Sequence, residues 1–280
     1  MKVLLCGLFF ILLAWAAHAD VSPDGHQDSL VRQLGTASVN WTSGRIVAGG
    51  SSAFKAEGKD IGHKVHLAER QARVKATRNL FDALGQMKLN SSSTFGELWI
   101  AAPEIRQNVS SMVHQAVVVD KAQTAGAYHL VEVFLLLDLW DEHTRLFMPV
   151  ALFQAPETEG FLGEGLQLPG DCVIYMDTDG LDLNPAVIPS IIDEQGTLVF
   201  RASILGSAKN SGNSRVSYVR SFRDSVMFRP GGQGQTTWIR AGRASGKNSS
   251  DIQLDKEGAE KFRQVISSTN DGCTVKIILQ

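Results

Sequence analysis

One helical stripe constrains the fold of this chain more than any other feature. Between residues 60 and 84, small and apolar side chains recur at spacings of three and four, which places them on one face of an α-helix. The stripe consists of Ile61, Val65, Ala68, Ala72, Ala76, Leu80 and Leu84. A long helix with one apolar face needs another layer to cover that face. Gly85 is expected to end the helix, because glycine is common just past a helix C-terminus.

The residues around this helix predict strands on both sides of it. Residues 45–49 favour a short strand, a second helix should begin near Pro103, and strands are expected at 116–120 and 128–137. In the last segment, alternate residues from Val131 to Leu137 are apolar and fall on one face. A layer of helices on a mostly antiparallel sheet accommodates this order of elements.

A segment rich in turn-forming residues divides the chain. Residues 154–171 contain four glycines and two prolines, and this composition predicts a linker. Beyond it, strands are expected at 172–176, 191–192, 198–200, 235–239, 251–254 and 273–279, with a helix at 255–268. The rest of the stretch from 202 to 246 is rich in Ser, Gly, Asn and Arg and predicts no firm element. We therefore predict an α+β fold of two modules, 41–153 and 172–280, each a mostly antiparallel sheet with helices packed on it.

The first 40 residues carry a targeting signal. Lys2 precedes an apolar run that closes on Ala17-His18-Ala19, a small-x-small cleavage site, so residues 1–19 are predicted to be a secretory signal peptide. The run is shorter than the roughly 20 residues of a membrane-spanning helix. Asp20, where a lipoprotein has cysteine, argues against lipid attachment. Residues 20–40 are polar without a sustained period and are expected to be a mobile lead-in. The processed chain should therefore be exported and lack a transmembrane helix.

Short motifs in both halves carry a family resemblance. In the first half they are Ile46-Val47-Ala48-Gly49-Gly50, the helix from Ala68 through Leu80, Val117-Val118-Val119, and the strand around 128–133. This half resembles the module shared by a family of small outer-membrane lipoproteins, flagellar protein P and the amino-terminal domain of flagellar assembly protein T.

The second half is similar to a carboxy-terminal extension of secreted relatives. The residues that carry this likeness are Asp177-Thr178-Asp179-Gly180-Leu181, Asn184 through Pro189, Ile192 through Gly196 and Ala259 through Ile278. The resemblance implies a periplasmic envelope protein that faces the outer membrane and has a scaffolding or assembly role without known catalysis. The missing lipid-attachment cysteine is a departure from the family.

Two cysteines remain after the predicted processing, Cys172 and Cys273. Export permits a disulfide between them, which would close a loop of about 100 residues and stabilise the fold by several kcal/mol. Each cysteine also begins an apolar run, as a buried free thiol on a strand does. The sequence leaves both alternatives open.

Motifs for metal binding and catalysis are weak. His63, His66 and Glu69 fit a solvated helix face better than a zinc site, which commonly pairs histidines four residues apart. A group of polar residues resembles a calcium loop, but its glycine and its twelfth residue do not fit, and a turn is favoured. The group consists of Asp177, Asp179, Asp182 and Asn184. No Gly-x-Ser-x-Gly nucleophile or dinucleotide-binding glycine pattern is present. We expect no enzyme activity, metal or cofactor.

Charge is nearly balanced, with 27 basic and 29 acidic residues, which argues against a nucleic-acid binder. Residues 215–247 depart from this average, because they contain seven basic residues and only one acidic residue. The candidate surface for an anionic partner consists of Arg215, Arg220, Arg223, Arg229, Trp238 and Arg240. Alternating arginine and aromatic residues are equally typical of a half-exposed sheet face.

Two functions follow from these observations. The first is a non-catalytic envelope scaffold or assembly factor for a flagellar or other envelope machine, with envelope proteins or a second copy as partners and peripheral association with the outer membrane. The alternative is a periplasmic binding module for an anionic glycan or lipid, based on the basic segment. A hydrolase is disfavoured because no nucleophile and base are paired.

Overall fold

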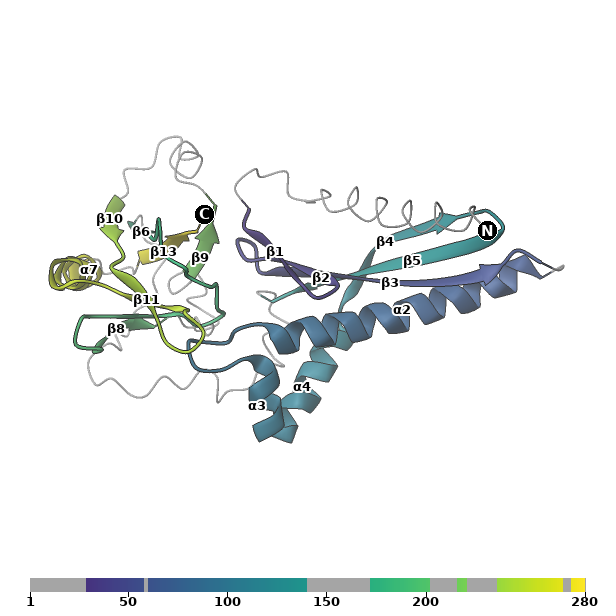
Figure 1. Ribbon diagram of the computed structural model, residues 1–280, viewed down its shortest axis with the longest axis horizontal. Coiled ribbons are helices and arrows are strands. Elements are labelled where there is room, and N and C mark those ends of the chain that lie inside the picture. The colour runs from purple at the N-terminus through teal and green to yellow at the C-terminus, as the bar shows by residue number, and fades with distance from the viewer. Residues whose placement is uncertain are drawn as a thin grey trace, which may run out of the picture.

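The computed structural model describes residues 29–57, 60–139, 172–201, 216–220, 236–268 and 273–279. The predicted signal peptide and linker lie outside these residues. The described chain folds into two α+β modules, so the predicted fold class is confirmed (Figure 1). No helix in these ranges is long and apolar enough to cross a membrane.

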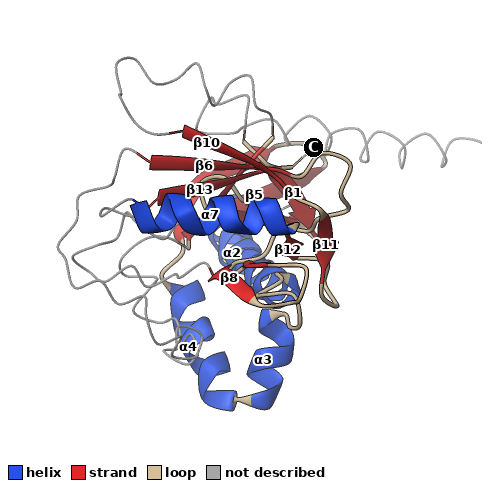
Figure 2. Ribbon diagram, turned by 90° about the vertical axis from the view of Figure 1, so that its left-hand side faces the viewer, coloured by secondary structure: helices blue, strands red, loops and turns tan. Residues whose placement is uncertain are grey.

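The first module is a five-stranded antiparallel sheet with helices on one side. Its strands are β1 (Val31–Leu34), β2 (Ala37–Asn40), β3 (Arg45–Lys55), β4 (Val117–Thr124) and β5 (Tyr128–Asp138), in the order β1-β2-β3-β5-β4. The helices α2 (Ile61–Gln86), α3 (Phe95–Ala101) and α4 (Pro103–His114) lie between β3 and β4 in the chain. Both views show α3 and α4 projecting from α2 on the side away from the sheet (Figures 1 and 2).

The prediction of a mobile lead-in is wrong for residues 31–40, which form the hairpin β1–β2. Gly35 at its turn has a φ of 59°, a left-handed conformation that glycine adopts without strain. Ala37 and Val39 are fully buried, and Val39 pairs with Ile46 of β3. The alternation of buried and half-buried residues spans only four positions, too few to identify a strand from the sequence alone, so the pairing with β3 decides that this segment is a strand.

The predicted helical stripe is confirmed from Ala68 to Leu84, because Ala68, Ala72, Ala76, Leu80 and Leu84 are buried. At the start of the helix the prediction is wrong for Ile61, which is 38% exposed, and Val65 is only half-buried. Three of the buried stripe residues are alanines because the strand approaches the helix closely at one glycine. A Cβ atom added to that glycine, at position 50, would lie 2.2 Å from the Ala72 carbonyl oxygen and 2.3 Å from the Ala76 backbone nitrogen. Only small residues fit on both sides of this contact.

The helix α2 does not end at Gly85 as expected, but continues to Gln86. Gly85 lies against the Trp99 ring of α3, where an added Cβ would be 2.5 Å from the ring atom Cζ2. This glycine therefore serves packing between two helices. The helix α3 was not anticipated by the sequence analysis, although Thr94 and Glu97 at its start form a capping box.

In its described residues, the second module contains two small sheets and one helix. The first sheet, in the order β10-β6-β13-β9, has β6 (Cys172–Asp177), β9 (Val216–Val219), β10 (Thr236–Arg240) and β13 (Cys273–Ile278). The second, in the order β11-β12-β7-β8, has β7 (Ser190–Ile192), β8 (Leu198–Arg201), β11 (Arg243–Ser245) and β12 (Asp251–Gln253). The helix α7 (Lys256–Ser268) contacts β10 and β8, and its Phe262 is fully buried.

The strand pairing corrects the mostly antiparallel sheet predicted for the second module. All three pairings of the sheet β10-β6-β13-β9 are parallel, as is the pairing of β12 with β7. Parallel strands need long crossover connections, and α7 lies in the one that joins β10 to β13. All residues from Cys172 to Met176 are buried, and such a continuous apolar run is typical of a parallel strand that is covered on both faces.

Cys172 and Cys273 form a disulfide, so the bridged alternative is the one that the structure adopts. The two residues are direct partners at the start of β6 and β13, with their Cα atoms 4.7 Å apart. The bridge therefore joins the two central strands of the parallel sheet across a sequence separation of 101 residues.

Candidate functional site

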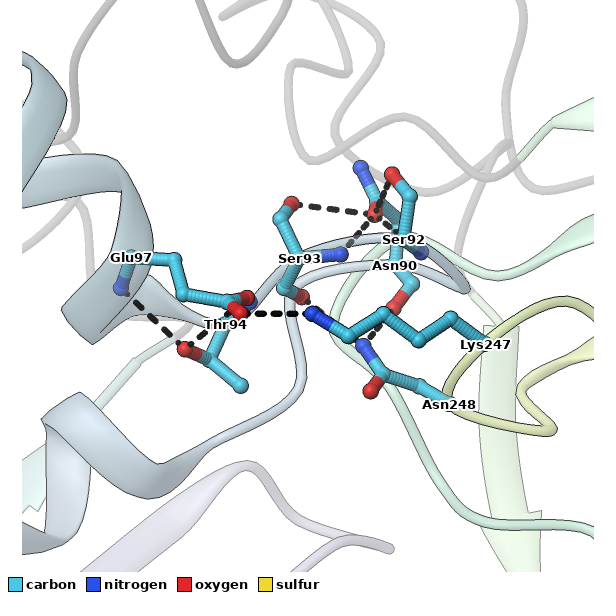
Figure 3. Close-up of polar contacts among 7 residues, drawn as sticks. All are labelled: Asn90, Ser92, Ser93, Thr94, Glu97, Lys247 and Asn248. Carbon is cyan, nitrogen blue, oxygen red and sulfur yellow. Dashed lines mark hydrogen bonds and ion pairs between the residues drawn. The ribbon is translucent and has the colours of Figure 1, made fainter.

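The two modules share one continuous hydrophobic core and meet at a junction of two loops. Residues 87–94 of the first module join α2 to α3, and residues 246–250 of the second join β11 to β12. Each loop contains the sequence Asn-Ser-Ser, beginning at Asn90 and at Asn248. We call these two loops the junction; Figure 3 shows their polar side chains in contact.

The first loop is shaped by its own side chains. The Oδ1 atom of Asn90 accepts hydrogen bonds from the backbone N–H groups of Ser92 and Ser93, each at 2.9 Å, which closes a turn. Thr94 then caps α3, because its hydroxyl accepts the N–H of Glu97 at 3.2 Å while the Glu97 carboxylate accepts the N–H of Thr94 at 2.8 Å. The loop therefore presents its carbonyl oxygens in a fixed arrangement.

Asn248 of the second module forms hydrogen bonds with these carbonyl oxygens. Its side-chain Nδ2 donates to the carbonyl oxygens of Asn90 at 2.9 Å (Figure 3) and Ser93 at 3.3 Å. Its backbone N–H donates to the carbonyl oxygen of Ser91 at 2.8 Å. In return, the Lys88 ammonium donates to the Asn248 carbonyl at 3.3 Å. One asparagine thus forms hydrogen bonds with four residues across the junction.

Charged groups also cross the junction. Lys247 Nζ lies 2.7 Å from Glu97 Oε1, and the hydrogen bond from this ammonium holds the pKa of the Glu97 carboxyl below its usual range. The Ser91 hydroxyl donates to the carboxylate of Asp251, whose other oxygen accepts the Ser190 N–H at 3.0 Å. Because both side chains of the Lys247–Glu97 pair are largely exposed, the pair contributes more to orientation than to stability.

Backbone pairing and apolar packing lie beneath these polar contacts. The N–H groups of Val187 and Ile188 donate to the carbonyl oxygens of Lys88 at 3.0 Å and Leu89 at 2.7 Å. The side chains of Leu89, Val187 and Ile188 are buried in the shared core. The two modules therefore join by the same kinds of contact that hold each module together.

Gly246 is required at the closest point of the junction. Its φ of 82° lies in the left-handed region, and an added Cβ would lie 2.3 Å from the Cβ of Ser91. A side chain at this position would therefore be strained in its backbone and would press against the other module.

A second contact between the modules is built around Tyr218 of β9. The Tyr218 ring meets Trp41 of the first module edge to face at 5.8 Å, and its carbonyl oxygen accepts the Thr42 hydroxyl. The Tyr218 hydroxyl donates to the Ala186 carbonyl and accepts the Ala186 N–H, each at 2.9 Å. Burial raises the pKa of Tyr218, so the hydroxyl stays protonated and keeps both bonds. Two separated contacts fix one relative orientation of the modules.

The predicted surface for an anionic partner is only partly described. Arg215, Arg223 and Arg229 lie outside the described residues. Arg220 follows β9 and Arg240 ends β10; both are exposed, and their strands are the two edges of the parallel sheet. The structure therefore separates these two arginine positions by three strand spacings, about 14 Å.

Trp238 lies on β10, and its ring stacks on Tyr175 of β6 with centroids 4.7 Å apart. The Lys261 ammonium of α7 donates to the Trp238 carbonyl oxygen at 2.9 Å. These contacts give Trp238 a packing role within the module, and its binding role stays a prediction.

The metal-like motifs occupy ordinary structural positions. Glu69 pairs with Lys121 of β4, which holds the pKa of the Glu69 carboxyl below its usual range. The Asp177 side chain accepts the N–H of Asp179 at 3.0 Å, as expected of a turn. In the part of the chain that the structure describes, no three His, Cys, Asp or Glu side chains are grouped as a metal site requires.

The junction residues were not predicted as functional residues from the sequence; they are Asn90, Ser91, Gly246, Asn248 and Asp251. The available signal was the repeated Asn-Ser-Ser sequence, which is also typical of any turn. No spacing rule indicates that two such turns, 158 residues apart, contact each other.

Comparison with known proteins finds a likeness in the second module. Residues 173–280 match the family model of the second domain of Treponema pallidum Tp0624. Over this module the chain is similar to that domain. The match covers the strands from β6 to β13 and does not extend to the first module. Among curated proteins, no sequence matches this chain.

Proposed function

We propose that this protein is an exported, non-catalytic scaffold of the bacterial envelope, which holds partners in fixed relative positions. The junction is the observation that carries the proposal. The two modules are joined by the hydrogen bonds of the junction, by a shared core and by a second contact at Tyr218. Joined in this way, they present their outer surfaces in one orientation. A scaffold depends on such a joint, whereas two independent binding modules need only a tether.

The location and the partners are part of the same proposal. The signal peptide pattern of residues 1–19 supports export to the periplasm, and the resemblance to outer-membrane lipoproteins and flagellar envelope proteins supports a place at the outer membrane. Envelope proteins or further copies of the chain are the proposed partners, in a flagellar or another envelope assembly.

Crosslinking in intact envelopes followed by affinity purification of the tagged full chain tests the proposal. We expect the wild-type chain to co-purify with defined partners. Gly246→Ala should lose part of this set, because the added methyl group presses the two modules apart at Ser91. Gly180→Ala is the matched control, since Gly180 also has a positive φ of 78° but has no atom within 4 Å of an added Cβ.

Two outcomes contradict the proposal. A wild-type chain that is strictly monomeric and recovers no partner is not a scaffold. A Gly246→Ala chain that is folded, has a loosened junction and still recovers every partner shows that the fixed orientation is not needed. Circular dichroism of both variants establishes that each is folded.

A second candidate function is binding of an anionic glycan or lipid. The observation that favours it is that Arg220 and Arg240 both stand at the carboxyl ends of parallel strands, the edge where open parallel sheets commonly bind ligands. A double Arg220→Gln, Arg240→Gln variant should elute earlier from an anionic matrix, while Lys256→Gln on α7 should not. Unchanged retention of the double variant rejects this function.

A further inference from the structure

A groove of about 540 Å³ lies between α2 and α4 in the first module. Figure 1 shows α4 on the side of α2 away from the sheet. Its apolar lining includes Val74 and Phe81 from α2 and Val113 from α4. Arg78 and Arg106 also line it. The first junction loop lies between the two lining segments in the chain, but the junction contacts described above do not involve the residues that line the groove.

The groove exists because α2 has a second apolar line opposite its alanine stripe. Leu67, Val74 and Phe81 are spaced seven residues apart, so they follow one another along one face of the helix. The α3–α4 hairpin covers only the end of this line, where Trp99 stacks on Phe81 with centroids 4.5 Å apart. Val74 is left 65% exposed and Leu67 46% exposed.

The charged side chains that line the groove are basic. Among the described lining residues they are Arg78 and Arg106, and none is acidic. The Arg106 guanidinium lies 5.9 Å above the Phe81 ring, and Arg78, with its side chain 84% exposed, contacts Asp82 at 3.8 Å. Residues 70–78 of α2 contain four basic residues and no acidic one. The groove therefore has an apolar floor and a basic border.

We propose that this groove docks an acidic amphipathic helix from a partner protein of the envelope. Val74 and Phe81 lie about 10 Å apart along α2, the distance between side chains two turns apart on a docked helix. The apolar face of such a helix would cover Val74 and the exposed part of Phe81, and its carboxylates would pair with Arg78 and Arg106. This inference rests on the proposed scaffold function and identifies the chemistry of one partner.

The alternatives fit the groove less well. Pairing of α2 with α2 of a second copy would bring two basic 70–78 segments together, which like-charge repulsion disfavours. A lipid surface is flat, whereas this surface is concave and lies between two helices. The charge and shape together favour the acidic helix.

The test uses the full processed chain and a fluorescein-labelled synthetic helix of about 20 residues, with leucines on one face and glutamates beside them. We expect saturable binding by fluorescence anisotropy. The double variant Arg78→Glu, Arg106→Glu should weaken binding at least about tenfold, and Val74→Asp should weaken it as well. Lys256→Glu on α7 makes a charge reversal outside the groove and should bind like the wild type. A matching peptide with lysine in place of glutamate should not bind.

Three results would overturn the inference: equal binding by the double variant and by Lys256→Glu, binding of phosphatidylglycerol vesicles but not of the peptide, or self-association that is lost only in the groove variants. Envelope co-purification of the same variants separates the two proposals. If the peptide fails to bind while partners are still recovered by every variant, the groove assignment fails and the scaffold function stands. If the peptide binds but no partner is recovered, the scaffold function fails.

Discussion

The two modules build their sheets in opposite ways. In the first module, three of the four strand pairings are hairpins or near-neighbour pairings, and one long helix covers the sheet. In the parallel sheet of the second module, no pairing joins consecutive strands by a tight turn. Local pairings cost less loop-closure entropy than distant ones. The first module should therefore depend on close packing, and the second on the covalent bridge between its central strands.

The largest effect should come from removing the disulfide. The double variant Cys172→Ala, Cys273→Ala should lower the free energy of unfolding of the second module by about 4 kcal/mol, because the bridge closes a long loop in the unfolded chain. Urea titration, followed by circular dichroism and tryptophan fluorescence, measures the change. A reducing agent should destabilise the wild type and leave the double variant unaffected.

If reduction of the disulfide destabilises the first module as much as the second, the proposed difference between the modules is contradicted. Hydrogen exchange measures the stability of each module residue by residue, through the protection of backbone amides in β3 and β5 and in β6 and β13. We expect protection to fall chiefly in β6 and β13.

A smaller but still large effect should come from packing in the first module. Gly50→Ala places a methyl group 2.2 Å from the Ala72 carbonyl oxygen, so α2 must move away from the sheet. We expect a loss of about 3 kcal/mol from the free energy of unfolding. Gly62→Ala is the control, because Gly62 lies in α2, the helix that packs on Gly50, and has no atom within 4 Å of an added Cβ; this substitution should slightly stabilise the helix. Equal effects of the two substitutions would show that the close approach does not hold the module.

The smallest effect concerns acid stability of the second module. Asp193 accepts a hydrogen bond from Arg263 of α7 at 2.8 Å, and this contact, with the N–H groups of Thr197 and Gln195, holds the pKa of the Asp193 carboxyl below its usual range. A carboxyl with a lowered folded-state pKa stabilises the fold above its unfolded pKa of about 3.9 and loses that contribution as the pH falls through the folded value.

Asp193→Asn should therefore reduce stability at neutral pH and weaken its dependence on pH below about 4. Thermal unfolding from neutral pH to well below the unfolded pKa of about 3.9 measures this. Asp179→Asn removes one exposed carboxyl from the same module and serves as the control. An Asp193→Asn variant with the same acid dependence as the wild type would show that the Arg263 contact is not formed in solution.

Features set by local periodicity could be predicted from the sequence. The alanine stripe of α2 and the start of α4 at Pro103 follow from patterns within one helix, and both are confirmed. The hairpin β1–β2 could not be predicted, because Ala37 and Val39 become strand residues only through pairing with β3. The parallel direction of β6 was also missed, although its continuous apolar run indicated burial on both faces.

The residues of the two candidate surfaces were harder to predict for the same reason. Asn90 and Asn248 look like ordinary turn residues, and their function arises only where distant loops meet. Arg78 and Arg106 are typical solvated helix residues until the fold places them around one apolar groove. A pattern within one element is visible in the sequence, whereas a contact between elements depends on topology.

The central claim is that the junction holds the two modules in one orientation, and distance measurement between them tests it most directly. Spin labels at Arg70→Cys on α2 and Lys256→Cys on α7 can be compared by double electron–electron resonance in the processed chain. The account predicts one narrow distance distribution, which broadens in Gly246→Ala but not in Gly180→Ala. A broad distribution in the otherwise wild-type chain would contradict it.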